Sequence, residues 1–317
     1  MSATIHPSGH SSGPSSGHSS GHPITPRSSL PGPVKNQQVA AALGRSRKRT
    51  DLILRVLSYA ATGVGLVFLA SILATLFVKG FGAMDLAVFT EITRPPGSNG
   101  GLLNAIVGSF MQVVLATLIG TPIGMLVGTY LAEYAKGSPF GNVVRFVSDI
   151  LLSAPSILIG LFVYQLLVLP FGGFSGWAGV AALAIIVIPI VVRTTEDMLI
   201  LIPNTLRESV IALGSPKWKM IILVCWRSAR SGIITGVLLA IARVAGETAP
   251  LLFTSLGNNA WSTDLTQPMP SLPITIYSYA GSPFQDWIEL AWAGALIITL
   301  AVLLLNILAR SVLRSGK

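Results

Sequence analysis

Long stretches without a charged side chain constrain this chain more than any other feature. Residues 56–78 form one such stretch of 23 residues, residues 102–132 a second of 31, and residues 150–192 a third of 43. About 20 apolar residues in a helix cross the hydrocarbon core of a bilayer. Charged residues make up only 10% of the chain, against about 25% in a soluble domain. The sequence therefore predicts an all-α protein that spans a lipid bilayer several times.

Six spans account for the apolar sequence. The third stretch contains Pro-Phe-Gly-Gly-Phe-Ser-Gly-Trp at residues 170–177, and this cluster of glycines with a proline predicts a turn between two spans. A fifth span is expected at residues 231–253 and a sixth at residues 290–309. The predicted fold is therefore a polytopic bundle of six transmembrane helices.

Basic side chains predict the orientation of the spans. Lys and Arg gather before the first span, after the second, after the fourth and after the sixth, whereas residues 254–289 contain neither. Cytoplasmic loops of membrane proteins carry an excess of Lys and Arg. Six spans with both termini in the cytoplasm place every basic cluster on one side. The net charge of +9 then follows membrane topology, and nucleic acid is not an expected partner.

The first 49 residues differ from the rest in composition. They begin with a low-complexity run of Ser, Gly, His and Pro, which cannot bury a hydrophobic core. His6, His10, His18 and His22 could hold a metal ion, but nothing preorganises these ligands. We therefore expect a disordered cytoplasmic tail at residues 1–49 and no metal site.

Glycines and prolines within the spans predict close packing and kinks. Gly120, Gly124 and Gly128 recur every four residues and form a flat stripe that lets another helix approach closely. Spans two, three and four each contain a proline, which removes a backbone donor and favours a kink. These prolines are Pro122, Pro155 and Pro189.

A polar segment at residues 203–219 separates spans four and five. Thr205 and Glu208 have the spacing of a capping box, with Thr205 as the N-cap of a short helix and Glu208 at its third position. The apolar residues of that helix recur at i, i+4 and i+7 and give it one apolar stripe. They are Leu206, Val210 and Leu213.

The same segment contains signals for a helix end and a helix start. Gly214 is expected to end the short helix in the left-handed conformation. Ser215 and Pro216 are expected to begin another helix as N-cap and first residue. The short helix either fits a groove in another protein or lies on the lipid surface, and the pattern leaves both open.

Two charged residues interrupt the predicted fifth span. Arg243 and Glu247 are four residues apart, so they share one face of a continuous helix. A lone charge at the bilayer centre costs at least about 2.5–3.5 kcal/mol. The pair therefore either neutralises itself as a packing ion pair or lines a hydrated path. Arg193, at the end of span four, is a third charged candidate.

The chemistry of an enzyme is missing from the sequence. No Gly-x-x-x-x-Gly-Lys-Ser/Thr run is present to bind nucleotide phosphates. No nucleophile–base constellation is apparent, because all four histidines lie in the tail. The single cysteine, Cys225, excludes an intrachain disulfide. We expect a protein that is not an enzyme on its own and that binds no cofactor itself.

Several motifs resemble a known transporter family. Glu208-Ser-Val-x-x-x-Gly214 resembles the Glu-Ala-Ala-x-x-x-Gly loop of ABC-transporter permeases, in which the short helix docks on the ATP-binding subunit. Other motifs resemble the permeases of phosphate-specific importers in particular. They lie at residues 130–134, 154–156, 192–196, 246–252, 261–265 and 271–277.

This resemblance implies a fold, a location and partners. The fold would be that of type I ABC importer permeases, in the bacterial inner membrane, with its core at residues 102–313 and the first span and an external loop at residues 50–101. The partners would be a second permease subunit, an ATP-binding subunit dimer that carries ATP and Mg²⁺, and an extracytoplasmic phosphate-binding protein.

The resemblance also implies roles for individual residues. Arg193 and Arg243 would face the path of phosphate, with Glu247 holding Arg243 in place. The cytoplasmic coupling loop at residues 203–219 would contact the ATPase through Thr205, Leu206, Glu208, Val210, Leu213 and Gly214.

Some residues depart from the family pattern, and other functions remain open. Ser209 and Val210 replace the usual pair of alanines, and Trp226-Arg227 replaces a usual Leu-Pro pair. The helix is therefore expected to continue straighter into span five. The alternatives are a permease for sulfate, molybdate or another oxyanion, an ion-gradient-driven carrier, and a non-transporting membrane scaffold.

Overall fold

The computed structural model describes residues 33–98 and 100–314 and contains two compact units, residues 1–67 and 68–317. Part of the predicted tail, residues 1–32 with all four histidines, lies outside the described residues. Helix α1, Pro33–Gly82, begins within the region predicted as tail and continues into the second unit. The division of the chain at residues 49 and 101 stays a prediction.

Helices form nearly all regular structure of the second unit, and its one β-bridge joins Leu256 to Met269 in the described part of the chain. The all-α prediction is confirmed. After α1, the elements are α2 Ala87–Thr90, α3 Leu103–Glu133, α4 Pro139–Ser153, α5 Ser156–Val163, the π-helix η1 Tyr164–Val168, α6 Leu169–Phe171, α7 Gly176–Ile200, α8 Asn204–Ala212, α9 Lys217–Met220, the π-helix η2 Ile221–Cys225, α10 Trp226–Val244, α11 Ala249–Thr254, α12 Leu272–Ala280 and α13 Gln285–Arg314.

The described helices provide five to six candidate membrane spans. Five helices are long and apolar enough to cross a bilayer, and the pair α4 with α5–α6 forms a sixth if it is counted as one broken span. The five are Asp51–Gly82, Leu103–Glu133, Gly176–Ile200, Lys217–Val244 and Gln285–Ile307. The count of six thus includes one span of unexpected shape.

That third span is bent by 106° between α4 and α5. The predicted kink at Pro155 is therefore a break. Ala154, directly before the proline, has an extended conformation with ψ of 137°, because the proline ring disfavours the helical region for its predecessor. Pro122 and Pro189 lie inside helices α3 and α7, which continue through them.

The fifth span also differs from the prediction of residues 231–253. Helix runs without a break from Lys217 to Val244 through α9, η2 and α10, which agrees with the straighter path expected from Trp226-Arg227. It stops before Gly246, and α11 starts separately at Ala249. Pro250 fits the first turn of that new helix, where its missing N–H has no partner to lose.

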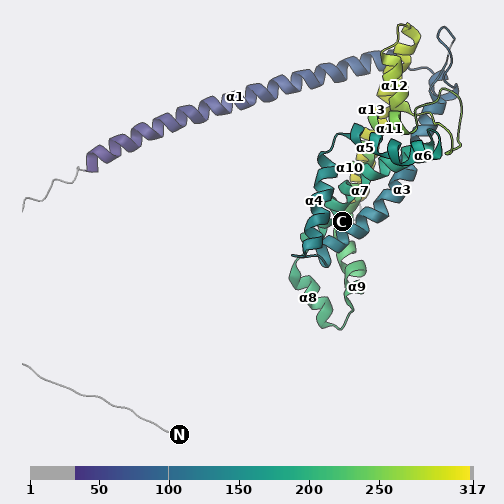
Figure 1. Ribbon diagram of the computed structural model, residues 1–317. Coiled ribbons are helices and arrows are strands. Elements are labelled where there is room, and N and C mark those ends of the chain that lie inside the picture. The colour runs from purple at the N-terminus through teal and green to yellow at the C-terminus, as the bar shows by residue number, and fades with distance from the viewer. Residues whose placement is uncertain (1–32, 99, 315–317) are drawn as a thin grey trace, which may run out of the picture. The chain divides into compact units, whose positions relative to one another are not determined.

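Helix α7 lies at the centre of the second unit, between α3 and α10 (Figure 1). Its apolar window is 72% buried, against 22% for α3. The predicted glycine stripe forms the contact of α3 with α7. A Cβ atom at Gly124 would lie 2.7 Å from the Cβ of Val191, and one at Gly128 would lie 2.6 Å from the oxygen of Val192.

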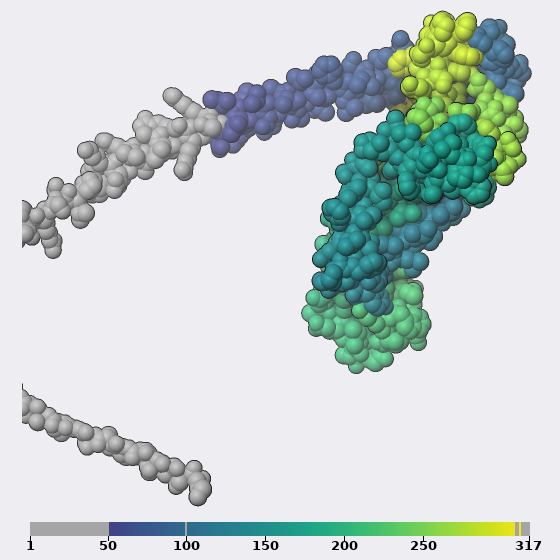
Figure 2. Space-filling model, in the orientation of Figure 1, coloured from purple at the N-terminus to yellow at the C-terminus, as the bar shows by residue number. Residues whose placement is uncertain are grey.

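Helices α8 and α9 project from one end of this bundle, beyond the end of α7 (Figure 1). The space-filling view shows them as a separate knob on that end (Figure 2). We call α8, α9 and the turn between them, residues 204–220, the elbow.

We predict that Gly124→Leu destabilises the protein, because the larger side chain has no room against Val191. Overpacking of this kind costs about 1–3 kcal/mol. Thermal unfolding of the purified protein in detergent measures the loss. Gly65→Ala is the control, since a Cβ at Gly65 in α1 meets nothing within 4 Å. Equal melting temperatures for both variants would contradict the tight α3–α7 contact.

Candidate functional site

The elbow starts differently from the capping-box prediction, which was wrong. Pro203 is the N-cap of α8, and the helix begins at Asn204 without a side-chain cap. Pro203 has φ of −59° and ψ of 142°. The helix therefore begins at the next residue, one position before Thr205. Thr205 lies inside the first turn, where its main-chain oxygen accepts a bond from Ser209 Oγ at 2.7 Å.

The end of α8 agrees with the prediction. Gly214 has φ of +78°, and its N–H donates to the oxygen of Ile211 at 2.9 Å. The left-handed conformation carries no steric penalty for glycine, so the chain reverses within a few residues. The restart is shifted by one residue from the prediction, with Pro216 as N-cap and α9 beginning at Lys217.

The apolar residues of α8 divide between two directions. Val210 is half-buried and packs against the cluster beneath the elbow, which includes Leu199 and Met220. Leu213 is 87% exposed and Ile211 is 51% exposed. Glu208 is exposed as well. The elbow therefore has an exposed apolar tip, with the exposed Glu208 on the same short helix.

A buried ion pair that the sequence analysis missed anchors the elbow. Arg207 of α8 donates from Nε and Nη2 to Oε1 of Glu133, at 3.1 and 2.8 Å. It also donates to the main-chain oxygens of Leu199 and Ile202 at the end of α7. The two charged side chains are 9% and 3% exposed. One guanidinium thus connects α8 to both α3 and α7.

The two arms of the elbow are α8 and α9, and α9 also contacts Glu133. Lys217, at the start of α9, donates from Nζ to the main-chain oxygen of Glu133 at 2.7 Å. Its ammonium lies 4.2 Å from the ring centre of Tyr134, within the range of a cation–π contact. Glu133, the last residue of α3, therefore receives a basic side chain from each arm.

Another ion pair lies at the same end of the bundle. Arg145 of α4 donates from Nε to Glu196 of α7 at 2.6 Å and from Nη2 to the main-chain oxygen of Leu131 at 3.1 Å. Glu196 is 4% exposed. Both ion pairs follow one rule, that a carboxylate at the end of an apolar span needs a cation. That rule could have identified Glu133 and Glu196 from sequence.

The charged pair of the fifth span lies across the break in that span. Arg243 is in the last turn of α10, and Glu247 follows the helix end. The expectation of one continuous helix face is therefore wrong. The two side chains still meet, with Nε of Arg243 3.8 Å from Oε1 of Glu247. Arg243 is 50% exposed and Glu247 is 14% exposed.

Arg193 and Arg243 have different ion-pair partners in the described part of the chain. Arg193 lies 3.4 Å from Asp197 and 4.0 Å from Asp149. Arg243 instead lines a small cavity with Ile186 and Ile190 of α7, about one to two helical turns from Arg193. That cavity has a volume of about 10 Å³, room for at most one water molecule, so this chain alone forms no anion pocket there.

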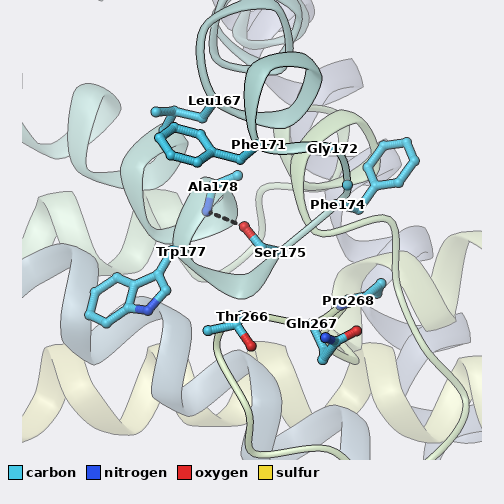
Figure 3. A pocket seen from close by; sticks show the side chains of 11 residues that line it. Leu167, Phe171, Gly172, Phe174, Ser175, Trp177, Ala178, Thr266, Gln267 and Pro268 are labelled. Atoms are coloured by element: carbon cyan, nitrogen blue, oxygen red, sulfur yellow. Dashed lines mark hydrogen bonds between the residues drawn. The ribbon is translucent and has the colours of Figure 1, made fainter.

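A larger cavity, drawn in Figure 3, is lined by Ser175, Trp177 and Ala178 at the start of α7, whereas the elbow follows the end of that helix. Its volume is about 790 Å³, and none of its lining side chains is charged. Ser175, which borders this cavity, is the N-cap of α7, and its hydroxyl oxygen accepts a hydrogen bond from the N–H of Ala178 at 3.2 Å. The lining of this cavity therefore supplies no cationic side chain.

Comparison with known proteins supplies the family. The family of binding-protein-dependent transport system inner membrane components matches residues 120–315. The phosphate transport system permease protein PstA of Pasteurella multocida is 58% identical over 264 residues, 83% of this chain and 94% of the relative. The PstA of Haemophilus influenzae is 56% identical with the same coverage. The probable PstA of Methanocaldococcus jannaschii is 36% identical, again with that coverage.

Solved structures support the fold. A chain of a bacterial ABC transporter involved in alginate import superposes with a TM-score of 0.59 at 15% identity, and the match covers 86% of this chain and 99% of that one. A chain of the inward-facing MetNI methionine ABC transporter gives 0.54 at 16% identity, with coverage of 68% and 94%. At such identities only the fold is shared. The sequence identities and the family match establish that this chain is an inner-membrane permease of the PstA family of ABC transporters.

Proposed function

We propose that this permease forms part of the path of inorganic phosphate in an ATP-driven importer. The relatives that carry the name phosphate transport system permease match over 94% of their own length, so the similarity includes the whole permease. The observation that carries the mechanism is the anchored elbow. Its base is held by Arg207, and its apolar tip is exposed beyond the spans.

The energy would come from a separate subunit. Since the chain contains no phosphate-binding glycine loop of its own, ATP and Mg²⁺ would bind to a dimer of ATPase subunits in the cytoplasm. The elbow would fit a groove of that ATPase, with both termini of this chain on the same side. A second permease subunit and an extracytoplasmic phosphate-binding protein would complete the complex.

The half-exposed Arg243 supports a path shared between subunits. A guanidinium suits phosphate, because its planar fork donates to two oxygens and stays charged. The cavity beside Arg243 is too small for the anion, so a second permease subunit would have to supply the opposite wall. Glu247 would orient Arg243 and weaken anion binding enough for release. Arg193 would contact the anion at a different depth in the membrane.

Sulfate and molybdate remain the alternative substrates, because an arginine pair alone does not separate tetrahedral oxyanions. An ion-gradient-driven carrier is disfavoured, since it requires no soluble partner at the elbow. Competition of unlabelled sulfate, molybdate and phosphate against labelled phosphate in vesicles separates the oxyanions. We expect only phosphate to compete at matched concentration, and efficient competition by sulfate would reassign the substrate.

We predict that Leu213→Cys reacts rapidly with a maleimide in the permease alone and slowly once the ATPase subunits bind. Leu213 is 87% exposed at the tip of the elbow, whereas native Cys225 is fully buried and adds little background. Phe171→Cys is the matched control, because Phe171 is 82% exposed at the other end of α7. Protection of neither position, or of both equally, would argue against docking at the elbow.

We predict that Arg243→Gln lowers phosphate uptake by about tenfold or more, since a hydrogen bond to a charged group contributes about 1.5–3 kcal/mol. Uptake of labelled phosphate is compared at equal membrane expression. Arg230→Gln serves as control, because Arg230 is an exposed arginine of the same helix. Normal uptake by Arg243→Gln at normal expression would remove Arg243 from the path and leave a packing ion pair.

A further inference from the structure

Glu133 connects the elbow to α3, a helix that is not adjacent to the elbow in the sequence. The chain enters α8 through residues 201–203 and leaves it through residues 213–216, both short turns. Glu133 lies outside both turns and binds both arms, Arg207 through its carboxylate and Lys217 through its main-chain oxygen. A displacement of the elbow therefore acts on the end of α3.

The Glu133–Arg207 contact is built to resist separation. The two charged side chains are 9% and 3% exposed, so water competes little for either. Removing one partner from a buried pair leaves an uncompensated charge, which is strongly unfavourable. Arg207 also donates to the main-chain oxygens of Leu199 in α7 and of Ile202 just after that helix. The contact therefore keeps its geometry when the elbow is pushed.

Helix α3 continues from this contact to the other end of the bundle and contains Pro122. Its 31 residues extend about 45 Å at 1.5 Å per residue. Gly120, Gly124 and Gly128 hold it flush against α7, the most buried of the candidate spans. Because close-packed interiors deform little, α3 and α7 are expected to move as one body.

The far end of α3 holds the loop that follows the Arg243–Glu247 region. Asn104 donates from Nδ2 to the oxygen of Asn259 at 2.8 Å. Ser109 Oγ accepts from the N–H of Leu272 at 2.6 Å. Both partners lie on the chain between α11 and α12 or at the start of α12. The same helix thus contacts the elbow at one end and this loop at the other.

We propose that Glu133 and Arg207 form the joint through which elbow movement enters α3, and that Arg207 is a positioning residue for transport. This inference rests on the proposed ATP-driven function. The joint lets a displacement at the ATPase side reach the loop at residues 255–271, at the far end of α3. Breaking it leaves the ATPase docked but weakly connected to the path.

The ratio of phosphate transported to ATP hydrolysed tests the joint in proteoliposomes containing the complete complex. For Arg207→Gln we expect the ATPase subunits to co-purify and hydrolyse ATP, while the ratio falls by about tenfold, a typical size for coupling between sites. Glu133→Gln keeps an oxygen that accepts from Arg207, so it should retain more of the ratio than Glu133→Ala.

Arg145→Gln is the matched control. It breaks the neighbouring ion pair with Glu196 at the same end of the bundle, but Arg145 has no bond to the elbow. We expect the ratio to stay at the parent value. The proposed role of the Glu133–Arg207 contact would be overturned by an unchanged ratio of phosphate to ATP in Arg207→Gln, or by an equal fall of that ratio in the Arg145→Gln control. Loss of the ATPase from Arg207→Gln would overturn it as well, since Arg207 would then serve docking. If Arg207→Gln does not fold, Arg207→Lys and Glu133→Ala take its place.

A distance measurement tests the joint whatever the substrate. Spin labels are attached to Ser209→Cys on α8 and Leu118→Cys on α3, both exposed, in a Cys225→Ala background of the whole complex. The label distance should stay single and unchanged on addition of ATP, and should broaden when Arg207→Gln is added. An equally narrow distribution in Arg207→Gln would overturn the joint. A parent complex that fails to move phosphate would instead contradict the proposed function alone.

Discussion

A charge at the end of an apolar helix must find a counter-charge, and the elbow end of this permease depends on that constraint. Glu133 closes the 31-residue helix α3 and is 3% exposed in its ion pair. A buried carboxylate without a partner is strongly unfavourable. Arg207 donates to Oε1 of the Glu133 carboxylate, and Lys217 donates to the main-chain oxygen of the same residue. The position of the elbow follows from this requirement.

The same constraint explains the arrangement of the other charges within the spans. Glu196 is paired with Arg145, and Glu247 with Arg243. The first of these pairs is tight at 2.6 Å, whereas the second is 3.8 Å long and leaves Arg243 half exposed. A short, shielded pair suits a fixed support. A long pair with one free side suits an arginine that exchanges partners with a passing anion.

Apolar runs, glycine spacing and turn residues predicted much of the fold. The all-α class, the glycine contact of α3 with α7 and the left-handed Gly214 are confirmed. The capping box was wrong, because Pro203 starts α8 before Thr205. The break between α4 and α5 is larger than a kink, because Ala154 is extended before its proline. Arg207 was missed because its partner lies 74 residues away, beyond any local pattern.

The most direct measurement is a pair of structures of the assembled complex, one without nucleotide and one with ATP bound. The account predicts that α8 occupies a groove of the ATPase in both. It also predicts that α3, α7 and the elbow turn together, with Arg207 still on Glu133. An elbow that swings while α3 stays in place, or one that touches lipid and no ATPase, would contradict the account.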